Sequence, residues 1–80
     1  MLFRSPTVLQ AAGIEGSVTL TYVIDTAGRV ESEGIELVAA TQQGFVAAAN
    51  EAVLTSRFRP ARKGHQPVRV RVRQVITFKH

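Results

Sequence analysis

The stretch "PVRVRVRQVITFK", residues 67–79, decides how the rest of the chain folds. Apolar and polar residues alternate along it, which is the pattern of a β-strand with one buried face. One face carries Val68, Val70, Val72, Gln74, Ile76 and Phe78, and the other carries Arg69, Arg71, Arg73, Val75, Thr77 and Lys79. The pattern predicts a sheet that packs on helices through one face and meets water through the other.

The positive charge of the chain is concentrated in its C-terminal part. From Arg57 onward there are eight Lys or Arg residues and no acidic residue, so the net charge of this part is +8. The first 56 residues hold two Arg and six Asp or Glu, a net charge of −4, and the sum is the +4 of the whole chain. Such an asymmetry predicts a basic C-terminal surface that meets an acidic or polar partner.

Length and composition exclude several classes of protein. A chain of 80 residues fits one small domain, residues 1–80, and 45% hydrophobic with 20% charged residues is typical of a globular protein. Cysteine is absent, and His65 and His80 stand alone, so we predict no disulfide, no metal site and no cofactor. No apolar run reaches the roughly 18–20 residues of a membrane span. Asp25 with Glu31 or Glu33 is interpreted as a hairpin turn flanked by solvent and not as a carboxylate pair for acid–base catalysis.

The first half of the chain predicts a short helix and two strands. Ser5 at the N-cap, Pro6 at the first helical position and Gly13 at the C-cap bound a helix of about two turns. Residues 16–24 alternate as a half-buried strand, and the "DTAG" that follows is a tight turn. A second strand is expected in "RVESEGIELV", residues 29–38, where a change of parity at the central glycine predicts a β-bulge.

The second half predicts the main helix and the last strand. A stripe at helical spacing begins near Gly44 and extends for about 12 residues; it contains Phe45, Ala48, Ala49, Ala52, Val53 and Ser56. Pro60 ends this helix, and residues 61–67 are predicted to form a loop. Gln74 is expected to mark where the last strand extends beyond the helices into water. The predicted core joins the helix to the strands through Val18, Leu20, Tyr22, Ile24, Phe45, Ala49, Ala52, Val53, Phe58, Val70 and Val72.

These elements follow the order αββαβ, which is an α+β fold. The first two strands form a hairpin, and the main helix returns the chain so that the last strand lies antiparallel beside the first. We expect a three-stranded antiparallel or mixed sheet in the order 2-1-3, with both helices packed on one face. The last strand is then an edge strand whose outer backbone donors and acceptors are unpaired.

Four motifs, taken in order, resemble the C-terminal domain of the TonB family of energy transducers. Pro6 to Ile24 resembles the family's proline, short helix, "AGIEG" and alternating strand. "DTAGRV", Asp25 to Val30, resembles its hairpin turn. The helix ending "RFRP" and the "GHQPV" that opens the last strand complete the set, which covers nearly the whole chain.

The resemblance implies a non-enzymatic, periplasmic interaction domain. In the family, an inner-membrane anchor and a Pro-rich spacer precede this domain, which binds the TonB box, a short segment of an outer-membrane transporter. The peptide adds a strand to the sheet by β-augmentation, and pulling on it transmits energy for uptake. The proton-driven motor of the inner membrane is expected to act only through N-terminal regions outside this chain.

The same resemblance indicates where the peptide binds. The expected peptide-binding edge is the outer side of the last strand, at Arg71, Arg73, Val75, Thr77 and Lys79. The segment expected to flank the binding groove is Phe3, Arg4, Ser5 and Pro6. Both sets are implied by the family and are expectations for the structure.

Two other functions stay open at this point. A small basic nucleic-acid-binding domain would use the positive charge, but sheets that bind nucleic acids carry aromatic residues on the exposed face, and the predicted exposed face has none. A structural homodimer would pair the same edge with itself. The arginines Arg69, Arg71 and Arg73 either contact an acidic partner or keep an exposed edge soluble.

Overall fold

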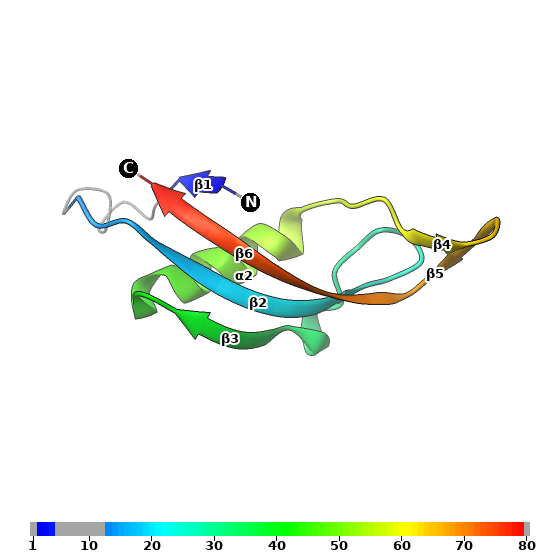
Figure 1. Cartoon of the computed structure of the whole chain (residues 1–80), viewed down its shortest axis with the longest axis horizontal. Helices are drawn as coiled ribbons and strands as arrows, with labels where there is room; N and C mark the ends of the chain where they lie inside the picture. The colour runs from blue at the N-terminus through cyan, green and yellow to red at the C-terminus, as the bar shows by residue number, and fades with distance from the viewer. Residues whose placement is uncertain (1, 5–12, 80) are drawn as a thin grey trace.

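The computed structural model of the chain describes residues 2–4 and 13–79. It is an α+β fold with a four-stranded sheet in the order β1-β6-β2-β3 (Figure 1). The strands are β1 (Leu2–Arg4), β2 (Gly16–Ile24), β3 (Glu36–Ala40) and β6 (Val70–Lys79). The helix α2 (Val46–Thr55) follows the 3-10 turn η2 (Gln43–Phe45), and another such turn, η1 (Ser32–Gly34), precedes β3. The neighbours β3, β2 and β6 confirm the predicted order 2-1-3.

The centre of the sheet is the antiparallel pair of β2 and β6. Its register is continuous, from Gly16 opposite Phe78 to Ile24 opposite Val70. Side chains are alternately more and less exposed along β6, as the sequence predicted. Along β2 the inward residues are all buried: Val18, Leu20, Tyr22 and Ile24. The two faces assigned from the alternation are therefore confirmed, except that Val23, on the outward face of β2, is also buried.

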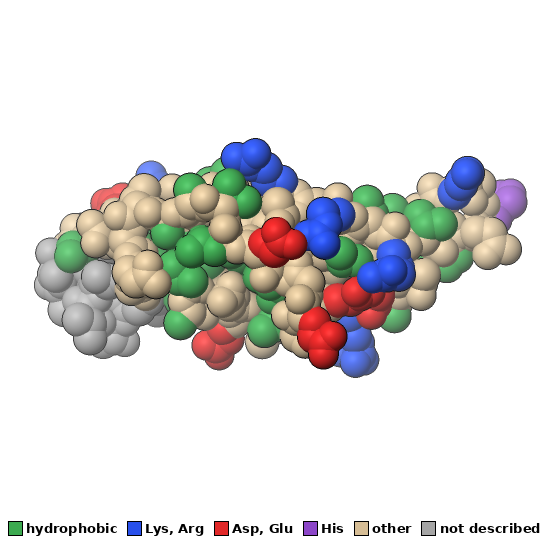
Figure 2. Space-filling view, turned by 90° about the horizontal axis from the view of Figure 1, so that it is seen from below, with side chains coloured by type: hydrophobic (Ala, Val, Ile, Leu, Met, Phe, Trp, Pro, Cys, Tyr) green, Lys and Arg blue, Asp and Glu red, His purple; other side chains and the backbone are tan. Residues whose placement is uncertain are grey.

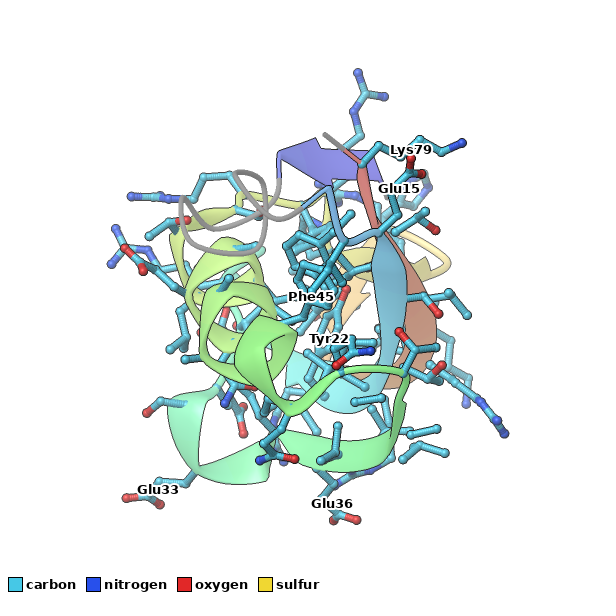
Figure 3. The ribbon with its side chains drawn as sticks, turned by 90° about the vertical axis from the view of Figure 1, so that its left-hand side faces the viewer. Glu15, Tyr22, Glu33, Glu36, Phe45 and Lys79 are labelled. Carbon is cyan, nitrogen blue, oxygen red and sulfur yellow. The ribbon has the colours of Figure 1, made fainter. Side chains whose placement is uncertain are left out.

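The helix α2 covers the inward face of the sheet (Figures 1 and 3). Its residues Ala49 and Val53 face the sheet and are fully buried. Phe45, just before the helix, stacks on Phe78 with ring centroids 4.7 Å apart. Figure 3 shows Phe45 and Tyr22 between the helix and the sheet, with both rings in the core. The predicted helical stripe therefore packs on β2 and β6.

One α-helix is present in the described part of the chain, instead of the two that were expected. The short helix predicted between Ser5 and Gly13 falls on residues 5–12, which lie outside the described residues. Within residues 2–4 and 13–79, no helix has both the length and the apolar character that crossing a membrane requires.

The depth of the core along β6 differs from the prediction. Ile76 and Phe78 are fully buried, whereas Val70 and Val72 pack only partly against the core. Gln74 does not mark the end of the packed face, because its side-chain oxygen accepts a hydrogen bond from the hydroxyl of Tyr22. A glutamine is accommodated there because the tyrosine supplies its hydrogen-bond partner. The end of the strand that extends beyond the core is the Val70 end.

The second predicted strand is shorter than expected. Val30 makes a single bridge to Ile24, the chain then turns through η1, and β3 starts only after that turn. The bulge predicted at Gly34 is wrong, because this residue lies in η1. The register of β3 on β2 shifts instead between Thr19 and Leu20. The change of parity in the sequence thus reflects a 3-10 turn and not an extra residue in a continuous strand.

Residues 61–67, which were predicted to form a loop, make up most of a second hairpin. The strand β4 (Ala61–Lys63) pairs antiparallel with β5 (Gln66–Val68). Gly64 at the tip has a φ of +64°, which a glycine adopts at no steric cost. Figure 1 shows this hairpin projecting beyond the end of the core.

The prediction that β6 is a free edge along its whole length is wrong. The strand β1 pairs with it in parallel, with Leu2, Phe3 and Arg4 opposite Thr77, Phe78 and Lys79. The outer side of the last three residues of β6 is therefore covered by the chain itself. Upstream of Thr77 the register with β1 ends.

Candidate peptide-binding edge

The backbone direction of each residue in β6 follows from the hydrogen bonds of β2. The N–H of Thr41 donates to the carbonyl of Ser17 at 3.0 Å, and the N–H of Glu31 donates to that of Val23 at 2.9 Å. Odd-numbered residues of β2 therefore turn their backbone groups away from β6, and even-numbered ones turn theirs toward it. Even residues of β2 stand opposite even residues of β6. The backbone groups that turn outward in β6 are thus those of Arg71, Arg73, Val75, Thr77 and Lys79, the five residues expected to bind a peptide.

The strand β1 occupies part of this outward side. Thr77 and Lys79 stand opposite Leu2 and Arg4 in the parallel pair. Upstream, no strand among residues 2–4 and 13–79 pairs with the outer side of Arg71 and Arg73. The open edge is therefore the stretch of β6 around these two arginines.

The segment expected to flank the groove is placed only in part. Phe3 and Arg4 belong to β1, where they stand opposite Phe78 and Lys79. They extend the sheet along its edge, next to the open part of β6, and their contact with a bound peptide stays a prediction. Ser5 and Pro6 lie outside the described residues.

Two of the three alternating arginines, Arg69 and Arg71, form ion pairs with acidic residues of the same molecule, whereas Arg73 forms none with the described residues. Nε and Nη2 of Arg69 donate to the two carboxylate oxygens of Glu31, both at 2.7 Å. Nη1 of Arg71 lies 3.7 Å from a carboxylate oxygen of Glu36, which belongs to β3. Arg73 has no carboxylate within salt-bridge distance in the described part of the chain. These side chains reach toward β3 and the turn before it, so they leave the open edge of β6 uncovered.

The ion pair between Arg69 and Glu31 contributes little to the free energy of unfolding. The hydrogen bonds from Arg69 are the main cause that lowers the pKa of Glu31. The guanidinium side chain is 62% exposed, and exposed ion pairs contribute little to stability because water and salt screen them. Beside this pair lies a surface depression of about 280 Å³, lined by Val23, Arg69, Val70 and Arg71. The pair with Glu31 therefore fixes the position of the Arg69 guanidinium but adds little to the stability of the fold.

The described side chains offer neither a stacking platform nor a metal site. Tyr22, Phe45 and Phe78 are buried, and Phe58 is packed against the core. Because bases stack on exposed aromatic rings, this distribution counts against nucleic-acid binding by the sheet. No group of three or more His, Cys, Asp or Glu residues in the same part of the chain is placed to hold a metal ion.

Residues 4–80 match the family described as the Gram-negative bacterial TonB protein C-terminal. The chain belongs to this family. The match includes β2, α2 and β6, the elements that form the core and the open edge. A comparison with curated proteins gives no match. TonB C-terminal domains are periplasmic interaction domains of Gram-negative bacteria; they act in energy transduction with outer-membrane transporters and are not catalytic.

Two parts of this TonB C-terminal domain were missed from the sequence. β1 has three residues, too few for an alternation to be visible, and its partner strand is far away in the chain. The β4–β5 hairpin was missed because its strands also have three residues each. Gly64 between them was the available signal, since a central glycine is typical of a short hairpin.

Proposed function

We propose that this TonB C-terminal domain binds an extended peptide by backbone pairing along β6, at Arg71 and Arg73. The peptide is the TonB box of an outer-membrane transporter, and the added strand transmits the energy for uptake. The observation that carries the proposal is the outward backbone of these two residues, which no described strand covers. A sheet edge of this kind binds extended peptides through main-chain hydrogen bonds.

The strand β1 supports the proposal because it already pairs with the same edge. Its three residues run parallel to residues 77–79, so the outer side of β6 is compatible with a parallel strand. A peptide that binds in line with β1 along the same edge pairs with β6 further upstream, at Arg73 and Arg71. Thr77 and Lys79 take part in binding only when the peptide displaces β1.

Backbone and charge make separable contributions to such binding. Each main-chain hydrogen bond contributes about 0.5–1.5 kcal/mol, and an exposed charge pair at Arg73 contributes about 0–1 kcal/mol. We therefore expect the affinity to depend mainly on the backbone groups, with the side chains setting selectivity.

The substitution Arg73→Pro tests this directly. Proline removes an N–H that points outward, so the hydrogen bonds between β6 and β2 are kept. The probe is an acetylated and amidated heptapeptide copied from a TonB box, and its binding is measured by fluorescence anisotropy. We expect Arg73→Pro to weaken binding by about tenfold or more, because it loses the N–H as well as the charge, whereas Arg73→Ala, which keeps the N–H, weakens it by at most about fivefold.

A matched variant checks the assignment of the backbone directions. Val72→Pro removes an N–H that faces β2, so this variant should lose the protection of β2 amides against hydrogen exchange. Arg73→Pro should keep that protection. Full binding by a folded Arg73→Pro variant would exclude backbone pairing, and complete loss in Arg73→Ala would show that binding is electrostatic.

Homodimerisation along the open edge stays a separate prediction. Self-pairing would bring Arg71 and Arg73 of two copies together, and like charges directly opposite one another are destabilising. Sedimentation over the micromolar range at low and high salt measures whether it occurs. The membrane anchor and the proton-driven motor concern regions outside this chain and remain part of the proposal.

A further inference from the structure

The β4–β5 hairpin projects from the molecule without a core of its own. Every residue from Arg62 to Pro67 is exposed, and the molecule is 47 Å long but only 18 and 16 Å across. Nη1 of Arg62 donates to the carbonyl of His65 at 3.0 Å, which holds this guanidinium at the turn. The hairpin is thus an ordered extension whose side chains face solvent (Figure 1).

The hairpin and the segment before it carry four basic residues that no acid among the described residues neutralises. Arg57, Arg59, Arg62 and Lys63 have no carboxylate within salt-bridge distance among the described residues, unlike Arg69 and Arg71. Figure 2 shows acids and bases adjoining over the middle of the molecule, and at the projecting end basic side-chain atoms with no acidic side chain beside them. No acidic residue occurs from Arg57 to the C-terminus. An acidic ligand therefore meets no competing carboxylate within the hairpin.

The hairpin is continuous with the open edge. Only Arg69 separates β5 from β6, and Arg62 stands opposite Pro67 in the hairpin register. Pro67 is four residues before Arg71, which is about 13 Å along an extended strand. A peptide paired at Arg71 and Arg73 therefore needs a flank of about four or five residues to reach the hairpin. If it runs parallel to β6, as β1 does, that flank is its N-terminal one.

We infer that the β4–β5 hairpin binds acidic residues in the N-terminal flank of the captured peptide, through Arg62 and Lys63. This inference rests on the proposed function, since it assumes that a peptide pairs with the open edge. It assigns the partner segment a chemistry: a neutral strand-forming core preceded by Asp or Glu residues. Charge at the hairpin then selects among peptides that the backbone of β6 would bind alike.

The experiment compares three peptides with the same TonB-box heptapeptide core, all acetylated and amidated. One carries neutral Gly-Ser flanks at both ends, one carries three Glu residues in the N-terminal flank, and one carries them in the C-terminal flank. We expect the N-terminal Glu peptide to bind about three- to tenfold more tightly than the neutral peptide at low salt. The gain should shrink at 0.5 M salt, where exposed charges are screened.

Variants of the hairpin then assign the gain. The double variant Arg62→Gln, Lys63→Gln should lose the gain for the N-terminal Glu peptide and bind the neutral peptide as before. The double variant Ala47→Glu, Leu54→Glu changes two exposed positions on α2 and lowers the net charge by the same two units; it is the control for net charge and should keep most of the gain. A gain of equal size for the C-terminal Glu peptide, or a gain that survives the double variant of the hairpin, would overturn the inference and leave peptide capture intact. Failure of the neutral peptide to bind would overturn the proposed function, and this inference with it.

Discussion

Gly28 lies at the tightest contact between the turn after β2 and the segment after α2. Its φ is +83°, and a Cβ at this position would lie 2.0 Å from the carbonyl oxygen of Phe58. The N–H of Phe58 donates to the carbonyl of Gly28 at 2.9 Å, so the two segments are joined here. Oδ1 of Asp25 accepts hydrogen bonds from the N–H groups of Ala27 and Arg29, both at 2.9 Å, which closes the turn as the sequence predicted.

Gly28→Ala should therefore be strongly destabilising. A left-handed conformation alone costs a residue with a Cβ about 1–2 kcal/mol, and the contact with Phe58 adds to this cost. Gly64→Ala is the matched control, because Gly64 has a similar φ of +64° but nothing within 4 Å of the added Cβ. Urea unfolding should show a clearly larger loss for Gly28→Ala. Equal losses would mean that the contact with Phe58 gives way easily.

The hydrogen bond between Tyr22 and Gln74 can be isolated by a double-mutant cycle. Tyr22 is fully buried, and burial raises the pKa of its hydroxyl, which therefore stays a donor at neutral pH. Tyr22→Phe and Gln74→Leu should each lower the free energy of unfolding by roughly 1–2 kcal/mol, because each leaves a polar partner unsatisfied. The double variant should cost less than the sum of the two, by about 0.5–1.5 kcal/mol. Strict additivity would show that the bond does not form.

The two outer strands of the sheet differ in how they are protected. All five residues of β3 are exposed, with Leu37 and Val38 about half exposed, so this edge is the more apolar one. Its register on β2 shifts between Thr19 and Leu20, and such irregularities discourage a further strand from pairing. The open part of β6 has a continuous register and lacks this protection. A partner strand therefore finds a regular ladder on β6 and an irregular one on β3.

Removal of β1 should open the C-terminal end of this ladder. In a variant without residues 1–4, the outward N–H groups of Thr77 and Lys79 lose their covering strand, and their hydrogen exchange should become faster. The N–H groups of Ile76 and Phe78 face β2 and should keep their protection. Faster exchange at alternate residues of β6 distinguishes the loss of β1 from general unfolding, which would speed exchange at every residue. Uniform acceleration along β6 would contradict the assignment of backbone directions.

The projecting hairpin determines the shape of the molecule. The radius of gyration of 13.8 Å exceeds the roughly 11–12 Å expected of a compact chain of this length. The excess follows from the position of β4 and β5 beyond the core (Figure 1). A long basic extension beside an open edge lets one small domain contact a partner over two adjoining surfaces.

Acid should destabilise the fold through Asp25 and Glu31. Backbone hydrogen bonds, first that from Arg29, lower the pKa of Asp25, and the hydrogen bonds from Arg69 lower that of Glu31. Because both pKa values are lower in the folded state than in the unfolded state, the folded state binds fewer protons. The stabilisation is therefore complete above the ordinary values of 3.8 and 4.5, and it is lost as the pH falls through the folded values.

Urea midpoints measured from pH 7 to pH 2 check this dependence. The midpoint should stay level down to about pH 5 and then fall. Asp25→Asn and Glu31→Gln should each lower the urea midpoint at neutral pH and reduce its decrease in acid. Glu51→Gln is the control, because Glu51 is exposed on α2 with no cation within salt-bridge distance among the described residues. An unchanged acid transition in both test variants would contradict the assignment.

The sequence by itself determined which residues face the core and which elements form. Alternation along residues 16–24 and 70–79 and the helical stripe near Phe45 are local patterns, because side chains in strands and helices repeat with periods of 2 and 3.6 residues. The order of β3, β2 and β6 followed from the hairpin between the first two predicted strands and the helical crossover to the last one. The motifs that resemble the TonB family lie mostly between these segments, in the turn at Asp25 to Val30, after α2 and before β6. The residues that turn their backbone outward in β6 were among those predicted.

Only the tertiary structure decided how much of that edge is open and where the free charge lies. Three-residue strands such as β1 carry no periodic signal, and their pairing depends on contacts between distant parts of the chain. The sequence shows one basic tract, but Glu31 and Glu36 come from other segments and pair with Arg69 and Arg71. Arg62 and Lys63 in the hairpin and Arg73 in β6 are left without an acidic partner among the described residues. Such ion pairs depend on the distance between side chains in space, which cannot be read from their positions in the sequence.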